Sequence, residues 1–198
     1  MNTPQIVYRI DPSHRIIFVN EEWDRFARSN SGEKFTSDKV IGRVIWDFIS
    51  DPATESIYRE LLQTTSPADP VSFTFRCDAP DRKRQLRMII RLLEDRIVEF
   101  STETLSVTLA SQKHLSAYLP GTRSGEILHV CSWCKKIRSN AGWLEIESAL
   151  NESRLFEQEL MPKLSHGICE GCYSEMKSSI ARRMEGEDAR NPKVSTTW

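Results

Sequence analysis

The sequence lacks any long apolar run, and it has no excess of charge of either sign. Its 198 residues include 27 Lys and Arg against 28 Asp and Glu, a formal net charge of -1. A chain so close to neutrality is not expected to coat duplex nucleic acid, because proteins that do so carry a basic excess. Residues 1–5 have neither the basic start nor the apolar stretch of a secretory signal. We therefore expect a cytoplasmic protein that does not contact a membrane.

The short motifs of common enzyme classes are also missing. The chain has no protein-kinase signature, no Gly-rich phosphate loop, no nucleophile elbow and no helix-turn-helix pattern. The composition is otherwise that of a globular protein, with 39% hydrophobic and 28% charged residues and no low-complexity block. We therefore predict no catalytic residues and a function other than catalysis.

Apolar and polar residues alternate through much of the first half of the chain. Leu86, Met88 and Ile90 are predicted to face inward, whereas Arg87 and Arg91 face outward. The outward arginines are expected to pair with acidic residues of the next strand, namely Glu99 and Glu103. The same alternation predicts strands over residues 6–10, 15–19, 71–77, 84–93 and 96–105.

Two helices are predicted between the second and third strands. Asn20 is a suitable N-cap for the first, and Asp51 followed by Pro52 is typical of the start of the second. Because long connections occur only in this helical middle, we expect a five-stranded antiparallel sheet with helices on one face. The predicted fold class is therefore α+β.

Residues 5–105 resemble the PAS family. The similarity lies in residues 16–23, in Phe26 and Ala27, and in residues 41–49. The resemblance implies a sensory or dimerisation domain with a small central cavity, and it makes a homodimer one expected assembly. It does not support haem or flavin, because residues 45–65 contain no His and the Asn-Cys-Arg motif of flavin-type members is absent. Cys77 lies instead in a predicted strand, where we interpret it as a small buried apolar residue.

Four of the five cysteines form two C-x-x-C pairs. They are Cys131 with Cys134 and Cys169 with Cys172, with 34 residues between the pairs. Two such pairs can place four thiolates in a tetrahedron about 2.3 Å from one Zn²⁺, which leaves no open coordination position. We therefore predict a structural zinc site and no catalytic metal. An iron–sulfur cluster and a thiol–disulfide function are the alternatives.

The residues around the cysteines predict a treble-clef-like zinc domain. A knuckle holds the first pair, and residues 139–142 form a turn followed by an amphipathic segment. The second pair begins a helix, whose N-terminus stabilises thiolate charge. The predicted organisation is a PAS-like domain (1–105), a linker (106–127), a zinc-binding domain (128–186) and a disordered tail (187–198).

Residues 128–176 resemble a cysteine-rich segment found at the C-terminus of many bacterial signalling proteins. The similarity lies in Cys-x-x-Cys-Lys-Lys-Ile-Arg from Cys131 to Arg138, and in Ser-His-Gly-Ile-Cys-x-x-Cys from Ser165 to Cys172. The resemblance implies a signalling context and no particular mechanism. His166 is interpreted as a structural residue or as a hydrogen-bond partner of a ligating sulfur, and His129 as a strand residue.

Two functions follow from these features. The first is a non-enzymatic signalling protein, in which a PAS sensory or dimerisation domain is coupled to a zinc-stabilised module that binds a signalling partner. The second is a redox or zinc sensor, in which oxidation of the thiolates releases the metal.

A nucleic-acid-binding regulator is a third hypothesis. Trp133 and Trp143 are suitable for stacking on bases. The cations that this hypothesis requires are Lys135, Lys136, Arg138, Lys177, Arg182 and Arg183. Residues 106–198 nevertheless hold 12 basic and 11 acidic side chains, so the region lacks the charge excess of a nucleic-acid binder.

Overall fold

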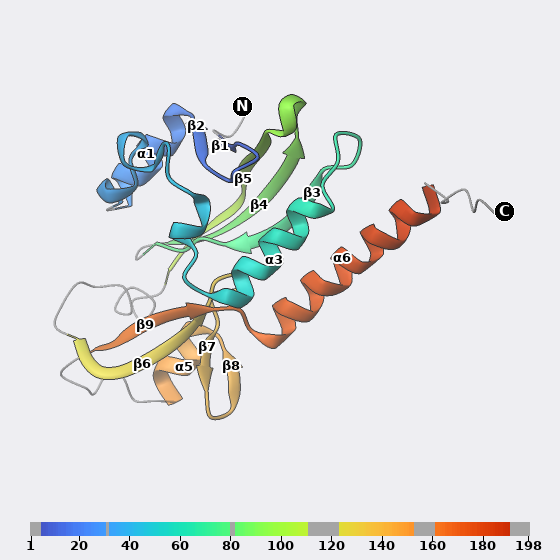
Figure 1. The fold of residues 1–198 in the computed structure, drawn as a ribbon. Helices are drawn as coiled ribbons and strands as arrows, with labels where there is room; N and C mark the ends of the chain where they lie inside the picture. The colour runs from blue at the N-terminus through green and yellow to red at the C-terminus, as the bar shows by residue number, and fades with distance from the viewer. Residues whose placement is uncertain (1–4, 31, 80–81, 111–122, 153–160, 191–198) are drawn as a thin grey trace.

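The first half of the chain forms an antiparallel sheet with helices packed on one face (Figure 1). The structure is a computed structural model that describes residues 5–30, 32–79, 82–110, 123–152 and 161–190. The five strands lie in the order β2-β1-β5-β4-β3, and every neighbouring pair is antiparallel. They are β1 (Ile6–Ile10), β2 (Ile16–Val19), β3 (Val71–Arg76), β4 (Arg82–Leu92) and β5 (Val98–Leu109). This confirms the predicted α+β sheet.

The two helices predicted between β2 and β3 begin where the sequence predicted, and a short helix that was not predicted lies between them. Asn20 accepts a hydrogen bond from the backbone N–H of Trp23 at 3.2 Å, and Asp51 accepts one from that of Thr54 at 2.8 Å. These side chains satisfy donors that the first helical turn leaves unpaired. The helices are α1 (Glu21–Ser29), α2 (Ser37–Val40) and α3 (Pro52–Gln63), with short 3₁₀ segments at Glu33–Phe35, Ile45–Phe48 and Glu94–Arg96.

The two faces of the first sheet differ as the alternation predicted. Met88, Ile90 and Phe100 are buried beneath the helices. On the opposite face, Arg87 pairs with Glu103 at 2.7 Å, which is one of the expected cross-strand pairs. Glu99 is paired with Arg9 of β1 at 2.8 Å.

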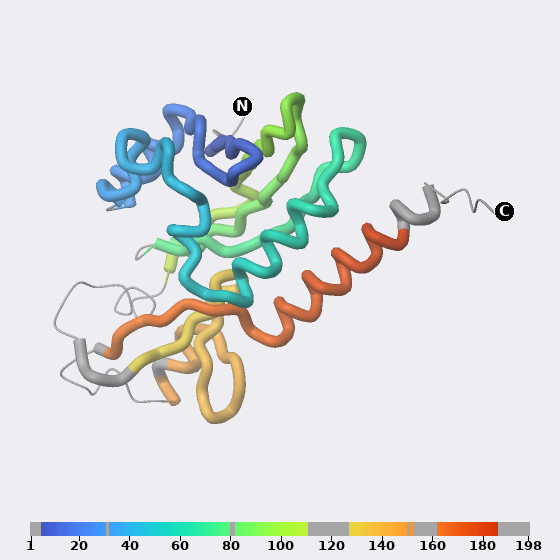
Figure 2. Tube along the Cα trace, viewed as in Figure 1, coloured from blue at the N-terminus to red at the C-terminus, as the bar shows by residue number. Residues whose placement is uncertain are grey.

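The second half forms a smaller sheet that the sequence did not predict in full. Its four strands lie in the order β8-β7-β6-β9, and β6 pairs with β9 in parallel. Figure 2 shows these two segments side by side although they are far apart in the chain. The elements are β6 (Arg123–Cys131), β7 (Ile137–Ser139), β8 (Gly142–Leu144), α5 (Ile146–Glu152), β9 (Met161–Gly167) and α6 (Glu170–Arg190).

Regular structure extends beyond the predicted boundaries. β4 and β5 pair as far as Arg82 opposite Leu109, so β5 enters the predicted linker, and β6 begins at Arg123 within it. Helix α6 continues to Arg190, four residues into the predicted tail. The rest of the linker, 111–122, and the rest of the tail lie outside the described residues.

One hydrophobic cluster spans both halves of the chain. Ile57 and Leu61 of α3 belong to it, and so do Cys131, Met176 and Ile180 of the second half. Helix α6 runs along α3 (Figure 1), and Lys177 of α6 bonds Glu60 of α3 at 2.6 Å. The cysteine-containing part therefore packs directly against the first sheet and its helices. Among the described residues, no helix has the length and apolar character needed to cross a membrane.

Candidate functional site

The four predicted metal ligands come together in one cluster. Their sulfur atoms all lie within 4.8 Å of one another, and those of Cys134 and Cys169 are 3.8 Å apart. Four sulfurs arranged tetrahedrally at about 2.3 Å from an ion would be separated by about 3.8 Å. The spacing and the all-thiol donor set therefore fit a Zn²⁺ ion bound by all four cysteines.

The first pair lies in a tight turn at the end of β6. The backbone N–H of Lys135 donates to the carbonyl of Cys131 at 3.0 Å, and the N–H of Cys131 donates to the carbonyl of Lys136 at 2.8 Å. Lys135 adopts a φ of 62°, the left-handed conformation that lets the chain reverse here. This turn directs the sulfurs of Cys131 and Cys134 to the same side.

The second pair lies at the start of α6. Cys169 immediately precedes the helix, and Cys172 is in its first turn. The backbone N–H of Cys169 donates to the sulfur of Cys131, and the backbone N–H of Cys172 donates to the sulfur of Cys169, both at 3.4 Å. Such bonds and the positive end of the helix dipole stabilise thiolate charge.

The electrostatics of the cluster favour a thiolate at its centre. Hydrogen bonds with Cys134 and Cys172 lower the pKa of the Cys131 thiol, whereas the bond to Cys131 raises the pKa of Cys134. Cys131 is fully buried and Cys169 is 6% exposed. Buried thiolates at these two positions would require a compensating cation, which a divalent metal ion bound by the cluster would supply.

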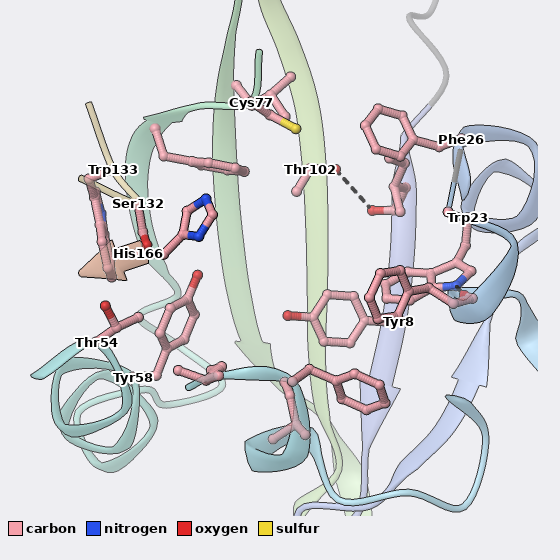
Figure 3. Close-up of a pocket in the computed structure, with 18 of the residues that line it drawn as sticks. Tyr8, Trp23, Phe26, Thr54, Tyr58, Cys77, Thr102, Ser132, Trp133 and His166 are labelled. Atoms are coloured by element: carbon pink, nitrogen blue, oxygen red, sulfur yellow. Dashed lines mark hydrogen bonds between the residues drawn. The ribbon is translucent and has the colours of Figure 1, made fainter. Parts of the chain in front are cut away.

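A cavity of about 720 Å³ lies beside the cysteine cluster, between the first sheet and its helices. Its lining is mainly apolar and rich in aromatic side chains, including Tyr8 of β1, Trp23 of α1 and Tyr58 of α3. The cysteine-containing half also contributes to the wall (Figure 3). The four residues that it contributes are Ser132, Trp133, Lys135 and His166.

His166 lies in this cavity wall, which the sequence did not predict. It is in β9, and Figure 3 shows its ring directed into the cavity beside Tyr58 and Trp133. Burial, and secondarily the charge of Lys135, lower the pKa of His166, which favours the neutral form of the ring. His129 lies in strand β6, as predicted.

Cys77 is separate from the cysteine cluster. It follows β3 and lines the cavity, and Figure 3 shows its sulfur directed inward. Burial raises the pKa of its thiol, which keeps it uncharged. The sequence predicted a small buried apolar residue here. Cys77 does lie in apolar surroundings, but its side chain is only partly buried.

Trp133 does not have the exposure that base stacking requires. It is 6% exposed, and its ring packs against those of Tyr58 and Phe73 at centroid distances of 5.7 and 5.8 Å. Two of the cations that nucleic-acid binding would require are bonded within the protein. Lys177 pairs with Glu60, and Arg183 donates a hydrogen bond to the carbonyl of Asp69 at 2.6 Å.

Comparison with known proteins finds several solved structures of low similarity, and two of them are PAS-type sensory proteins. No family model matches the chain, and no curated protein matches it. A sensory box sensor histidine kinase from Vibrio cholerae is 12% identical to this chain. The match covers 53% of this chain and 84% of the kinase structure's chain, with a TM-score of 0.37. The PAS domain of an HTR-like protein from Haloarcula marismortui is 18% identical to this chain. The match covers 52% of this chain and 84% of that PAS-domain chain, with a TM-score of 0.35. Both likenesses are weak, and neither indicates a role for this chain.

Proposed function

We propose that this chain is a non-enzymatic signalling protein that joins a PAS-type sensory domain to a module stabilised by zinc. The observation that carries the proposal is the four-cysteine cluster, whose sulfurs lie within 4.8 Å of one another and which belongs to the same core as α3. Four thiolates close the coordination shell of Zn²⁺, so the metal stabilises structure and has no position for a substrate.

The PAS-type assignment is supported by where the resembling residues fall. Residues 16–23 form β2 and the start of α1, and residues 41–49 include the 3₁₀ segment before α3. The order of two strands, several helices and three strands agrees with the order predicted from the hydrophobic pattern of the same residues. The aromatic cavity between sheet and helices is the feature expected of a sensory domain.

A treble-clef-like arrangement is supported by the order of elements around the cysteines. The knuckle at Cys131 is followed by the β7–β8 hairpin, and the second pair opens helix α6. Each pair is thereby held by a different type of local structure, a turn and a helix start, and the metal joins them.

Metal content and an optical spectrum of freshly purified protein test the proposed centre. We expect one zinc ion per chain and no absorption in the visible range. Cys131→Ser should lose the zinc, whereas the control Cys77→Ser, outside the cluster, should keep it. Iron with visible absorption, or wild-type protein without zinc, would contradict the proposal.

Partner capture tests the signalling role. Tagged protein should purify from cells with a signalling protein, and Cys131→Ser should reduce the amount recovered. A chain that has no stable partner under any condition would argue against this role.

A redox sensor is a second candidate, favoured by the partial exposure of Cys134 and Cys172. Exposed thiolates are accessible to oxidants even when they bind zinc. In this case mild peroxide should release zinc, which a colorimetric chelator detects. Zinc that stays bound under strong peroxide would exclude this function.

A further inference from the structure

Three polar groups project into the cavity without a hydrogen-bond partner among the described residues. Figure 3 shows the hydroxyls of Tyr8 and Tyr58 and the ring of His166 directed into one space. The indole N–H of Trp133, in the same wall, is buried and has no partner in the described part of the chain either. Unpaired polar groups in an apolar setting are unfavourable, and a bound polar molecule would satisfy them.

The charged groups of the lining are bonded elsewhere. Asp51 accepts hydrogen bonds from Thr54, Arg76 pairs with Glu145 at 2.9 Å, and Lys135 donates to the carbonyl of Ser132 at 3.0 Å. Burial raises the pKa of Tyr58 to about 12 and also raises that of Tyr8, so both hydroxyls are uncharged. The space between Tyr8, Tyr58 and His166 therefore offers neutral hydrogen-bonding groups.

The wall formed by the second half depends on the cysteine cluster. Ser132 and Trp133 are the two residues between Cys131 and Cys134, and His166 is three residues before Cys169. The N–H of Ser132 donates to the carbonyl of Gly167 at 2.7 Å, which joins the knuckle to the end of β9. A metal ion that fixes all four cysteines would therefore also fix this wall.

We propose that the cavity binds a planar, uncharged aromatic molecule bearing a hydroxyl or carbonyl group, and that the cysteine cluster with its metal completes the site. Aromatic walls suit a flat ring system, and Tyr8, Tyr58 and His166 suit one neutral polar substituent. The metal part of this inference rests on the proposed zinc centre. Because linkage is reciprocal, zinc raises the affinity for the molecule by the same factor as the molecule raises the affinity for zinc.

The first arm of the test measures the affinity of the full-length, zinc-loaded protein for 2-naphthol by calorimetry, with naphthalene as the comparison. We expect 2-naphthol to bind about tenfold more tightly, because it alone hydrogen-bonds the polar groups. Tyr58→Phe should remove most of that difference. The control Tyr173→Phe, on α6 and outside the cavity, should leave it unchanged. No binding of 2-naphthol, or equal affinity for both compounds, would overturn the proposal.

The second arm tests the contribution of the cysteine-containing half. His166→Leu keeps all four cysteines and should weaken 2-naphthol binding at least about fivefold. His129→Leu, in the neighbouring strand and outside the lining, should not. Zinc removal should weaken binding at least as much as His166→Leu does. Binding that responds to Tyr58→Phe but not to His166→Leu or zinc removal would overturn the composite site.

Metal content, measured separately on the same samples, distinguishes the two proposals. Protein that holds one zinc ion but fails both arms contradicts the cavity proposal and leaves the proposed zinc centre intact. Protein without zinc contradicts the centre whatever its affinity for 2-naphthol.

Discussion

Arg76 connects the first sheet to the turn that holds Cys131 and Cys134. It ends β3, and its backbone N–H donates to the carbonyl of Trp133 at 2.7 Å. Its guanidinium donates to the carbonyl of Cys134 at 3.1 Å and pairs with Glu145 at 2.9 Å. The side chain is only 19% exposed and also pairs with Asp78, whose side chain is fully buried. Hydrogen bonds at such sites are stronger than those at the surface.

Arg76→Gln should therefore be clearly destabilising. We expect the free energy of unfolding in urea to fall by about 2–3 kcal/mol, because several bonds to a charged group are lost together. Arg87→Gln is the matched control, since Arg87 pairs with Glu103 on an exposed face with 45% of its side chain accessible. That variant should lose less than about 1 kcal/mol. Equal losses in the two variants would contradict the role given to Arg76.

Single residues with a local signal could be predicted from the sequence. The four cysteines and the caps Asn20 and Asp51 are examples, because their chemistry depends on neighbours close in the chain. The position of His166 in the cavity wall could not be predicted. It depends on the pairing of β9 with β6, two strands that lie far apart in the sequence. Tyr58 lies in the second predicted helix, but the sequence did not distinguish a cavity wall from packed core.

Helix α6 is the element that joins the cysteine cluster to the first half. Cys172 lies in its first turn, and Met176 and Ile180 bury one side of it in the shared core. Lys177 bonds Glu60 of α3, and Arg183 bonds Asp69 in the loop that follows α3. The helix is therefore held both at its start and along its side.

Ile180→Ala should destabilise the protein through the loss of this packing. Ile180 is 2% exposed, and the cavity left by truncation is expected to lower the free energy of unfolding by about 3 kcal/mol. Met184→Ala, one turn further and 57% exposed, should change it by less than about 0.5 kcal/mol. Urea titrations followed by far-ultraviolet circular dichroism give both values. A small effect at Ile180 would mean that α6 is not held by the shared core.

Elements of the first half were predicted to within a few residues, whereas the second sheet was not. Strand alternation in β3, β4 and β5 is regular, and each strand pairs with another whose pattern is also regular. The pairing of β6 with β9 is parallel and joins residues more than thirty positions apart. No short-range sequence signal specifies such a pairing.

At the scale of the whole molecule, the first sheet, its helices, the cysteine-containing turn and α6 share one hydrophobic cluster, whereas the second sheet and α5 form a smaller one of their own. Polar contacts reinforce the larger cluster, including Lys83 of β4 with Glu147 of α5 at 2.5 Å. The four cysteines therefore lie in the same core as α3 and β3. The cavity lies where these parts meet, so its shape depends on both.

Amide hydrogen exchange of the full chain, with zinc bound and after zinc is removed by a chelator, tests this mutual support. We expect zinc removal to speed exchange in residues 131–180 and also in α3 and β3, which contact the cysteine-containing half. The β1–β2 hairpin, residues 6–19, should change least. Unchanged protection of α3 and β3, together with fast exchange confined to residues 131–180, would show that the two halves are independent and would contradict the shared core.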